Sequence, residues 1–470
     1  MLNARVLVFA LLISIGQVRA HDDGDRKWVA SWATSPATFF NYVAPAQPFV
    51  LMPGSPIQYV AANIQPDLAF PFPNATASGA AAVDQTFRSM VKPDLWGKTI
   101  RIRFSNVFGT TPVTFENVTV GLQDYSANVV AGTLVPVKFG GKRSVTIPAG
   151  LRPEARVFSD AVQLPWVDED DDIAVQGRNL AISYAVKGNS GPMTYHSGAN
   201  QTSFITAQGS RDHTGDLDAF AYEFTTTSWF YVETVDVRAH PDTVVVCAFG
   251  DSITDGTHTT LNINDRWMNV LSRRLHNAYG NRITIVNEAI GGNRVVPPAV
   301  ANATSGPAAV DRLDRDVLAL SGLTHVIWLE GINDLGALHS TASIISGYQD
   351  VVTRLHAAGV KVYAGTLTSA LGIYGVPFPT GDNGPVAEAG RQVLNDYIRN
   401  SGIFDGVEEF DLATLDPKTG NMKAAFLPNS QFTLLPWDYL HPNHAGYNAM
   451  GQAIDIAPFA PRHQRDRDSH

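Results

Sequence analysis

A serine, a histidine and an aspartate in this chain have the types and local settings that nucleophilic catalysis needs. Ser252 follows an apolar run that ends at Gly250 in "FGDSITDG", and Asp438 precedes His441 by three residues in "WDYLHPNHAGY". A serine hydroxyl is inert at neutral pH unless a base accepts its proton, and His441 is the candidate base. Asp438 could bind the other ring nitrogen of His441 and fix its orientation. We therefore predict a Ser-His-Asp relay for the hydrolysis of an acyl bond.

Two further segments supply groups that could stabilise an oxyanion. They are "NEAIGGN", which contains Gly292, and "LEGINDLG", which contains Asn333. The oxyanion of a tetrahedral intermediate needs donors that are already in place. The candidate donors are the backbone N–H groups of Ser252 and Gly292 and the side-chain amide of Asn333. Gly291 and Gly292 are adjacent, and Gly292 is chosen by its spacing from Asn287.

Each of these motifs also has a simpler interpretation. A Ser or Asp after a strand is often a helix N-cap, and Asp251 is expected to shape the turn rather than to react. The pair Asn333-Asp334 is typical of turns. A D-x-x-H spacing is common by chance. Their order along the chain, each after a predicted strand, favours one shared site.

Downstream of residue 240, apolar runs alternate with helical patterns. Strands are expected at 244–249, 282–286, 325–329 and 361–366, and helices at 267–279, 308–320, 345–358, 387–400 and 443–456. Uniformly apolar strands between helices predict a parallel sheet that is covered on both faces. The turns after such strands meet at one edge of the sheet, where sites of this fold class lie.

Upstream of residue 240, the apolar pattern has a period of two. Strands are expected at 99–105, 113–122, 143–147, 180–186 and 229–237, and extended loops at 37–82. Many short strands with little helical pattern predict an antiparallel sandwich or jelly roll. We therefore expect a β-rich accessory domain at 27–240, an α/β domain at 241–460 and a disordered polar tail at 461–470.

The four blocks "GDSIT", "NEAIGGN", "GIND" and "DYLHP" occur in the order that is typical of one hydrolase family. Over residues 242–457 the chain resembles the SGNH, or GDSL-type, hydrolases. In that resemblance Ser252, Gly292, Asn333 and His441 match the four hallmark residues, and Asp438 is the third member of the triad. It implies a flavodoxin-like three-layer α/β/α fold and esterase activity without a metal or other cofactor.

The chain as a whole is similar to a subset of secreted SGNH proteins that are grouped with xylan-degrading esterases. The similarity rests on Arg266-Trp267 after "GDSITDG" and on "WVASWATSP" near Trp28. It implies a short acyl ester, such as an O-acetyl group, on a plant-type polysaccharide. Trp437, next to Asp438, and Arg266 are the candidate substrate contacts.

Two other functions remain open at this point. A lipase or lysophospholipase could use the same site on acyl-glycerol esters, and the segment 369–379 is apolar enough to contact a lipid. A non-catalytic secreted carbohydrate-binding protein is less favoured, because a decayed site would have lost at least one of Ser252, Asn333, Asp438 or His441.

Composition and the N-terminal segment bear on location and partners. The formal net charge of −10 argues against a nucleic-acid partner. Residues 1–20 have a positive start at Arg5 and a short apolar run, which predicts a secretory signal and an extracellular or periplasmic protein. No later segment is apolar enough to span a membrane. Cys247 is the sole cysteine, so we expect a buried inert thiol and no intrachain disulfide.

The remaining sequence features are weaker signals, and none of them indicates an oligomeric state. The acidic run at 168–172 could bind calcium, but a solvated loop is favoured. N-glycosylation sequons, which matter only in a eukaryotic host, begin at Asn74, Asn117, Asn200 and Asn302. Histidines without a metal-ligand spacing are His196, His258, His339 and His444.

Overall fold

The C-terminal half is built on five parallel strands. In a computed structural model, which describes residues 26–38, 81–168, 174–297, 305–373, 383–428 and 438–462, the order is β17 (Ile283–Ala289), β16 (Val244–Gly250), β18 (His325–Leu329), β19 (Lys361–Gly365) and β20 (Gly406–Glu408). Numbered along this half, the order is 2-1-3-4-5, which is that of flavodoxin-like folds. The chain reverses its winding direction between β16 and β18, so a crevice is expected at the carboxyl ends of these two strands.

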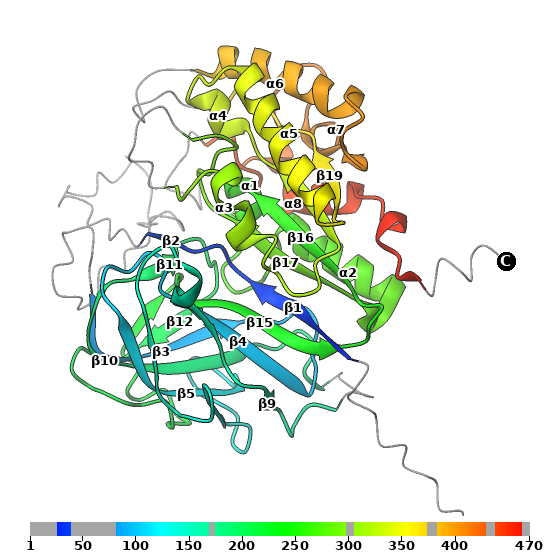
Figure 1. Ribbon diagram of the computed structural model, residues 1–470. Helices are drawn as coiled ribbons and strands as arrows, with labels where there is room; N and C mark the ends of the chain where they lie inside the picture. Colours follow the sequence, from blue (N-terminus) through cyan, green and yellow to red (C-terminus); the bar gives the residue numbers. More distant parts are fainter. Residues whose placement is uncertain are drawn as a thin grey trace, which may run out of the picture.

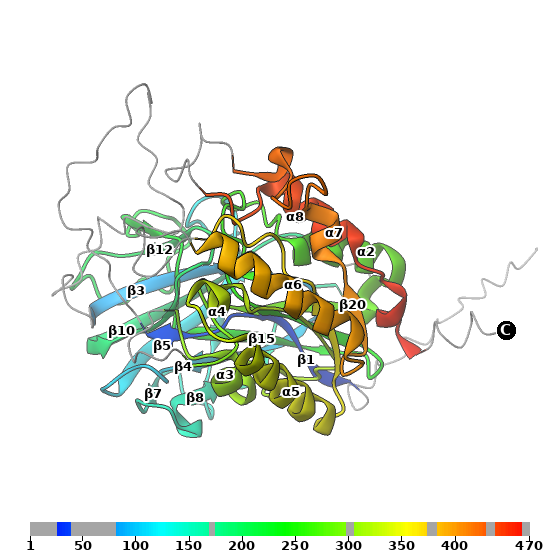
Figure 2. The same ribbon diagram turned by 90° about the horizontal axis from the view of Figure 1, so that it is seen from above.

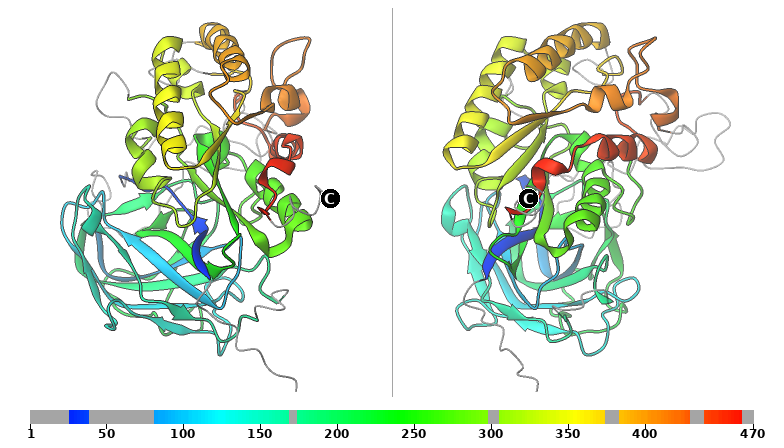
Figure 3. Two further views of the ribbon diagram at one scale, coloured as in Figure 1. Left: turned by 45° about the vertical axis from the view of Figure 1, so that its right-hand side comes forward. Right: turned by 90° about the vertical axis from the view of Figure 1, so that its right-hand side faces the viewer.

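Helices cover both faces of this sheet, as predicted (Figure 1). Figures 2 and 3 show α3, α5 and α6 on one side and α2, α7 and α8 on the other. The helices are α1 (Ser252–Asp255), α2 (Trp267–Tyr279), α3 (Ala309–Asp316), α4 (Ile332–Gly336), α5 (Thr341–Ala357), α6 (Gly384–Asn400), α7 (Phe410–Thr414) and α8 (His444–Ala453). The expected α/β architecture is therefore confirmed. The short elements α1, α4, α7 and β20 were not predicted.

The N-terminal half consists of antiparallel sheets. One sheet has the order β1 (Lys27–Ala33), β15 (Val232–Ala239), β4 (Thr99–Ser105) and β8 (Arg156–Phe158), with β9 (Val162–Gln163) also on β4. A second has the order β13 (Phe224–Thr226), β12 (Ser203–Ile205), β3 (Ala81–Val91), β10 (Leu180–Pro192), β5 (Val113–Leu122) and β6 (Val135–Val137), with β7 (Val145–Ile147) also on β5. A small third sheet contains β14 (Trp229–Phe230), β11 (Thr194–His196) and β2 (Ala37–Thr38).

Aromatic side chains join the two larger sheets face to face. Phe104 on β4 meets Phe115 on β5 at a ring-centroid distance of 5.2 Å and Tyr184 on β10 at 5.4 Å. Such alternating inward residues form the core of a sandwich. The prediction of a β-rich sandwich is confirmed.

The two halves are packed against each other. Strand β1 lies beside β17, where Thr284 donates to the Ala30 carbonyl at 3.3 Å. Ala30 N–H in turn donates to the Ser321 carbonyl at 2.9 Å. One cluster of buried apolar side chains contains residues of both halves. The apolar core is therefore continuous across residue 240. The domain boundary at this position stays a prediction.

Several predictions concern single residues or termini. Cys247 is buried, and burial raises the pKa of its thiol well above the ordinary value, so it is inert as expected. Asn200 is 5% exposed and donates to the Gly256 carbonyl, which is incompatible with a glycan at this sequon. None of the helices in the described ranges combines the length and apolarity that crossing a bilayer requires. The expected signal segment, most of 37–82, and 463–470 lie outside the described residues.

The contact between α2 and α8 is close enough to require a glycine. A methyl group added at Gly451 would lie 2.5 Å from the Trp267 carbonyl oxygen and 2.5 Å from Cβ of Val270. We predict that Gly451→Ala lowers the free energy of unfolding by about 1–3 kcal/mol, the usual cost of overpacking. Thermal denaturation measures this, with Gln452→Ala on the exposed face of α8 as the control. An unchanged melting temperature for Gly451→Ala would show that the interface between α2 and α8 can accommodate a methyl group.

Candidate active site

Ser252 is placed by a tight turn between β16 and α1. A side chain at Gly250 would collide with the Leu329 carbonyl oxygen of the neighbouring strand, so the turn requires glycine. The Asp251 carboxylate accepts the Ile253 N–H at 3.0 Å and caps α1, as its expected role in the turn requires. The Ser252 hydroxyl is thereby held at the carboxyl edge of the parallel sheet.

Ser252, His441 and Asp438 form a continuous chain of hydrogen bonds. Ser252 Oγ lies 2.8 Å from His441 Nε2, and His441 Nδ1 lies 2.8 Å from Asp438 Oδ2. A carboxylate only accepts, so Nδ1 carries the proton and Nε2 is free to accept from the serine hydroxyl. The other Asp438 oxygen, Oδ1, accepts the backbone N–H groups of Leu440 at 2.9 Å and His441 at 3.0 Å. The structure therefore brings together all three residues that the sequence singled out.

The electrostatics of this chain suit a general base. Burial alone would raise the pKa of Asp438, but the charge of His441 and donors from His258 and His441 hold it far below its ordinary value. Burial lowers the pKa of His441, yet the Asp438 carboxylate and its hydrogen bond outweigh this and raise the net pKa above 6.5. Asp438 therefore stays ionised and stabilises a proton on His441.

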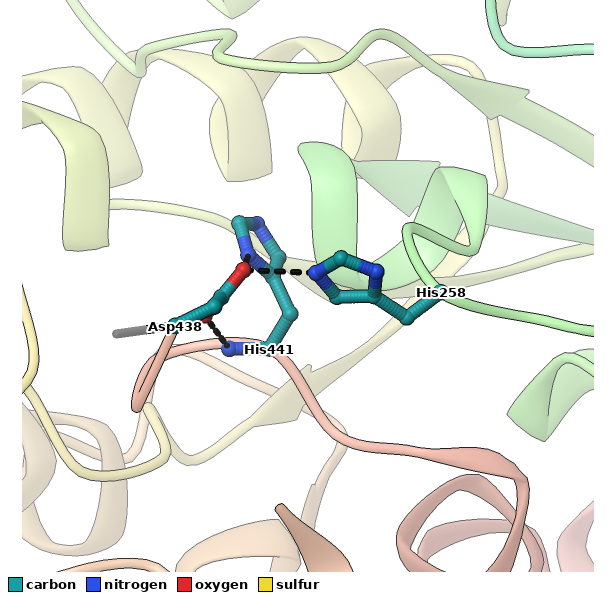
Figure 4. A group of neighbouring side chains, drawn as sticks. All are labelled: His258, Asp438 and His441. Atoms are coloured by element: carbon teal, nitrogen blue, oxygen red, sulfur yellow. Dashed lines mark hydrogen bonds and ion pairs between the residues drawn. The ribbon is translucent and has the colours of Figure 1, made fainter. Parts of the chain in front are cut away.

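Asp438 has a second imidazole partner that sequence reasoning missed. His258 Nε2 lies 2.7 Å from Asp438 Oδ2, the same oxygen that binds His441. Figure 4 shows the carboxylate between the two rings. His258 has a left-handed backbone with φ of 65°, which is uncommon outside glycine. Its place six residues after Ser252, in the loop that follows α1, is the only trace of this role in the sequence.

The same three side chains are a possible metal-binding group. Their ligand atoms lie within 4.8 Å of one another, and among the described residues no other group of this kind occurs. In the structure both imidazoles are hydrogen-bonded to Asp438, which accounts for the grouping by itself. Of the acidic run considered for calcium, all but Asp168 lies outside the described residues.

The turn after β17 distinguishes the two candidate glycines. Gly291 N–H donates to Asp255 Oδ2 at 3.1 Å, so this group is already used. Gly292 has φ of 74°, and its N–H has no acceptor in the part of the chain that the structure describes. Asn333 donates one amide hydrogen to the Asn293 carbonyl at 3.0 Å, and the second hydrogen has no acceptor there. These contacts favour Gly292 over Gly291 as the oxyanion donor.

Asp334 ties this turn to the turn after β18. Its carboxylate is fully buried and accepts the N–H groups of Val295 at 2.9 Å and Val296 at 3.1 Å. Turn chemistry was the simpler interpretation of Asn333-Asp334, beside the prediction that Asn333 donates to the oxyanion. In the structure Asn333 keeps one amide hydrogen without an acceptor among the described residues. Asp334 instead binds the neighbouring loop through Val295 and Val296.

Two buried carboxyl groups directly follow the ends of β16 and β18. Burial raises the pKa of Asp251 to about 7 and that of Glu330 to about 8. Asp251 Oδ2 and Glu330 Oε1 have no hydrogen-bond partner among the described residues. The negative charge of Asp251, when present, contributes to the raised pKa of His441.

The structure describes only one of the two candidate substrate contacts, Arg266. Arg266 is 6% exposed, and its guanidinium donates to the carbonyl oxygens of Asp255, Gly198 and Ala199. Arg266 thus links the two halves by hydrogen bonds. Its contact with substrate stays a prediction. Trp437 lies outside the described residues.

A cavity of about 410 Å³ lies between the halves. Residues that line it include Trp32, Trp96, Asn264, Asp255 and Arg266. Neither Ser252 nor His441 lines this cavity. It is therefore separate from the place where an ester would meet the serine hydroxyl.

Comparison with known proteins agrees with this geometry. Residues 248–449 match the model of the GDSL-like lipase/acylhydrolase family. The C-terminal half is a GDSL-like acylhydrolase domain. The expected family and the expected class of carboxylic ester hydrolase are thereby confirmed. No curated protein matches the sequence.

Several solved structures resemble this chain weakly. A member of the lipolytic G-D-S-L family from Veillonella parvula has 16% identity, covering 45% of this chain and 95% of its own, with a TM-score of 0.31. A GDSL-like lipase from Bacteroides thetaiotaomicron has 16% identity, 48% and 89% coverage and a TM-score of 0.33. A carbohydrate acetylesterase from Sinorhizobium meliloti has 15% identity, 45% and 96% coverage and a TM-score of 0.31.

The raised pKa of His441 sets an expectation for the pH dependence of the acylhydrolase domain. His441 must be neutral to accept the serine proton, so kcat/KM should fall as the pH drops through a value above 6.5. Asp251→Asn keeps a capping side chain but removes a negative charge that raises this pKa, so the acid limb should move to lower pH. Initial rates from pH 5 to 9 measure both effects. A flat profile between pH 5 and 8 would exclude His441 as the base.

His258 should tune this same titration. A donor on Asp438 Oδ2 draws charge away from the oxygen that binds His441. We predict that His258→Leu moves the acid limb to higher pH by at most about one to two units, because a charge-assisted hydrogen bond contributes about 1.5–3 kcal/mol and one pH unit corresponds to about 1.4 kcal/mol. His258→Gln, which keeps a donor, is the control and should move it less. Equal pH profiles for both variants and the unmodified protein would show that His258 does not influence the pKa of His441.

Proposed function

We propose that the protein is a secreted serine esterase that works through an acyl-enzyme. The observation that carries this proposal is the chain of hydrogen bonds from Ser252 Oγ through His441 to Asp438, with each step at 2.8 Å. A nucleophile, a base and an orienting carboxylate in this arrangement are what acyl transfer by a serine requires.

The proposed reaction uses these groups in two acyl-transfer steps. Ser252 Oγ attacks the ester carbonyl carbon while its proton moves to His441 Nε2, and Asp438 stabilises the imidazolium. The carbonyl oxygen becomes an oxyanion that can accept hydrogen bonds from Ser252 N–H, Gly292 N–H and the Asn333 amide. The intermediate then collapses, and the leaving alcohol takes the proton from Nε2. Water attacks the acyl-serine by the same route and releases the acid.

The proposed substrate is a short acyl ester, such as an O-acetyl group, on a plant-type polysaccharide. Its support is the similarity of the whole chain to secreted esterases grouped with xylan degradation, together with the predicted export signal. Cleavage of long acyl-glycerol esters is the competing function. The apolar segment that would favour it, 369–379, lies mostly outside the described residues.

One experiment separates these functions. The mature protein and Ser252→Ala are incubated with acetylated xylan, p-nitrophenyl acetate, a long-chain p-nitrophenyl ester and a lysophospholipid. We predict release of acetate from xylan at a rate that exceeds cleavage of the long-chain substrates. Ser252→Ala should lose this activity because, among the described residues, Ser252 supplies the hydroxyl that is bonded to His441 Nε2, while its circular dichroism stays unchanged.

The other possible outcomes would support a different function or a different nucleophile. Faster release from the long-chain ester and the lysophospholipid would favour a lipase. Absence of cleavage on every ester would favour a binding protein. Full activity in Ser252→Ala would remove this serine as the nucleophile.

A further inference from the structure

Asp255 links the oxyanion turn to the β-rich half. It is the last residue of α1, three positions after Ser252. One carboxylate oxygen accepts Gly291 N–H at 3.1 Å, and the other lies 3.0 Å from Nε2 of His196, the last residue of β11. The two side chains are 8% and 4% exposed. Asp255 therefore connects the sandwich to the turn that carries Gly292 through these two contacts.

The partners of His196 fix where a proton must lie. His196 Nδ1 is 2.9 Å from the Ser35 carbonyl oxygen, which can only accept, so Nδ1 is protonated. Nε2 faces the Asp255 carboxyl group. A hydrogen bond there requires either an imidazolium with an ionised Asp255 or a neutral imidazole with a protonated Asp255. In both cases one proton lies between the two side chains, and the other Asp255 oxygen stays available to Gly291.

Neighbouring contacts hold the same segment of the β-rich half in place. Asn200 donates to the Gly256 carbonyl at 2.9 Å, and Arg266 donates to the Ala199 carbonyl at 2.8 Å. A side chain at Gly198 would collide with the Asp255 carboxylate. The approach of this segment to the end of α1 is therefore close.

We infer that His196 is a positioning residue for the oxyanion site, and that the β-rich half is part of the catalytic unit. By holding Asp255, His196 keeps Gly291 N–H engaged, while Gly292 N–H has no acceptor among the described residues. This inference rests on the proposed function, in which Gly292 donates to the oxyanion. It also explains why the acylhydrolase domain is packed against the sandwich instead of being joined to it by a linker.

Two substitutions at position 196 separate the two hydrogen bonds. His196→Asn has an amide where Nδ1 lies and can still reach Ser35, but it is too short for Asp255. His196→Gln has an amide where Nε2 lies and can still reach Asp255. Thr194→Val is the control for lost buried polarity, because Thr194 is on the same strand and bonds Phe108 N–H at 2.9 Å, away from Asp255.

The full-length variants are compared by steady-state kinetics on p-nitrophenyl acetate. We expect His196→Asn to lower kcat by about 10- to 100-fold, the range for a misplaced rather than a deleted donor, with KM within about twofold. His196→Gln should keep most of the activity, and so should Thr194→Val. Equal losses in His196→Asn and His196→Gln, or no loss in either, would overturn the inference.

Amide hydrogen exchange provides a readout that does not need activity. Peptides that contain Gly291 should exchange faster in His196→Asn than in His196→Gln or the unmodified protein, because Asp255 no longer holds the turn. Faster exchange without ester hydrolysis in the unmodified protein would refute the proposed function and retain the structural link. Ester hydrolysis with unchanged exchange and unchanged kcat would refute the role of His196 alone.

Discussion

The buried guanidinium of Arg312 is the interaction on which the site depends. Arg312 is fully buried and donates to the Gly250 carbonyl at 2.9 Å, the Glu288 carbonyl at 2.7 Å and the Asn293 side chain at 2.8 Å. It therefore joins the ends of β16 and β17 and the turn that carries Gly292. A fourth contact reaches Ser35 of the β-rich half at 2.8 Å.

A buried charge is tolerated only when it is paired and fully hydrogen-bonded. Asp316 lies 3.4 Å from Arg312. Burial would raise the pKa of Asp316, but the charges of Arg315 and Arg312 and a hydrogen bond from Arg315 lower it, so the carboxylate stays ionised. The positive charge of Arg312 is thus balanced by an ionised acid while its hydrogens hold backbone carbonyls. The turns around Ser252 are fixed by a charged network rather than by apolar packing alone.

Much of the architecture and the central site were predictable from the sequence. Apolar runs such as 244–249 and 325–329 are too short for typical helices and are followed by turn residues, which favours buried strands, and the motif blocks follow them in order. The relay could be named because Asp438 and His441 are close in sequence. Residues whose role depends on a tertiary contact could not be found in this way. His258 meets Asp438 across the fold, and His196 meets Asp255 from another sheet.

Short elements escaped prediction for a related reason. The strand β20 has three residues, and α1 and α4 have four and five, so none shows a full period of its pattern. The role of Arg266 could not be predicted from its position in the motif. Its place after "GDSITDG" indicated a functional residue, but that position does not reveal whether its partners are substrate or the carbonyl oxygens of another segment.

The pairing of β1 with β15 has a consequence for biosynthesis. Lys27 pairs with Ala239, and β1 also lies beside β17 of the acylhydrolase domain. During synthesis β1 therefore lacks its partner strand β15 until almost all of the β-rich half has been made. Contacts between such distant segments slow folding. Until then the backbone N–H and C=O groups of β1 are exposed, and unpaired strand edges of this kind favour association with other chains.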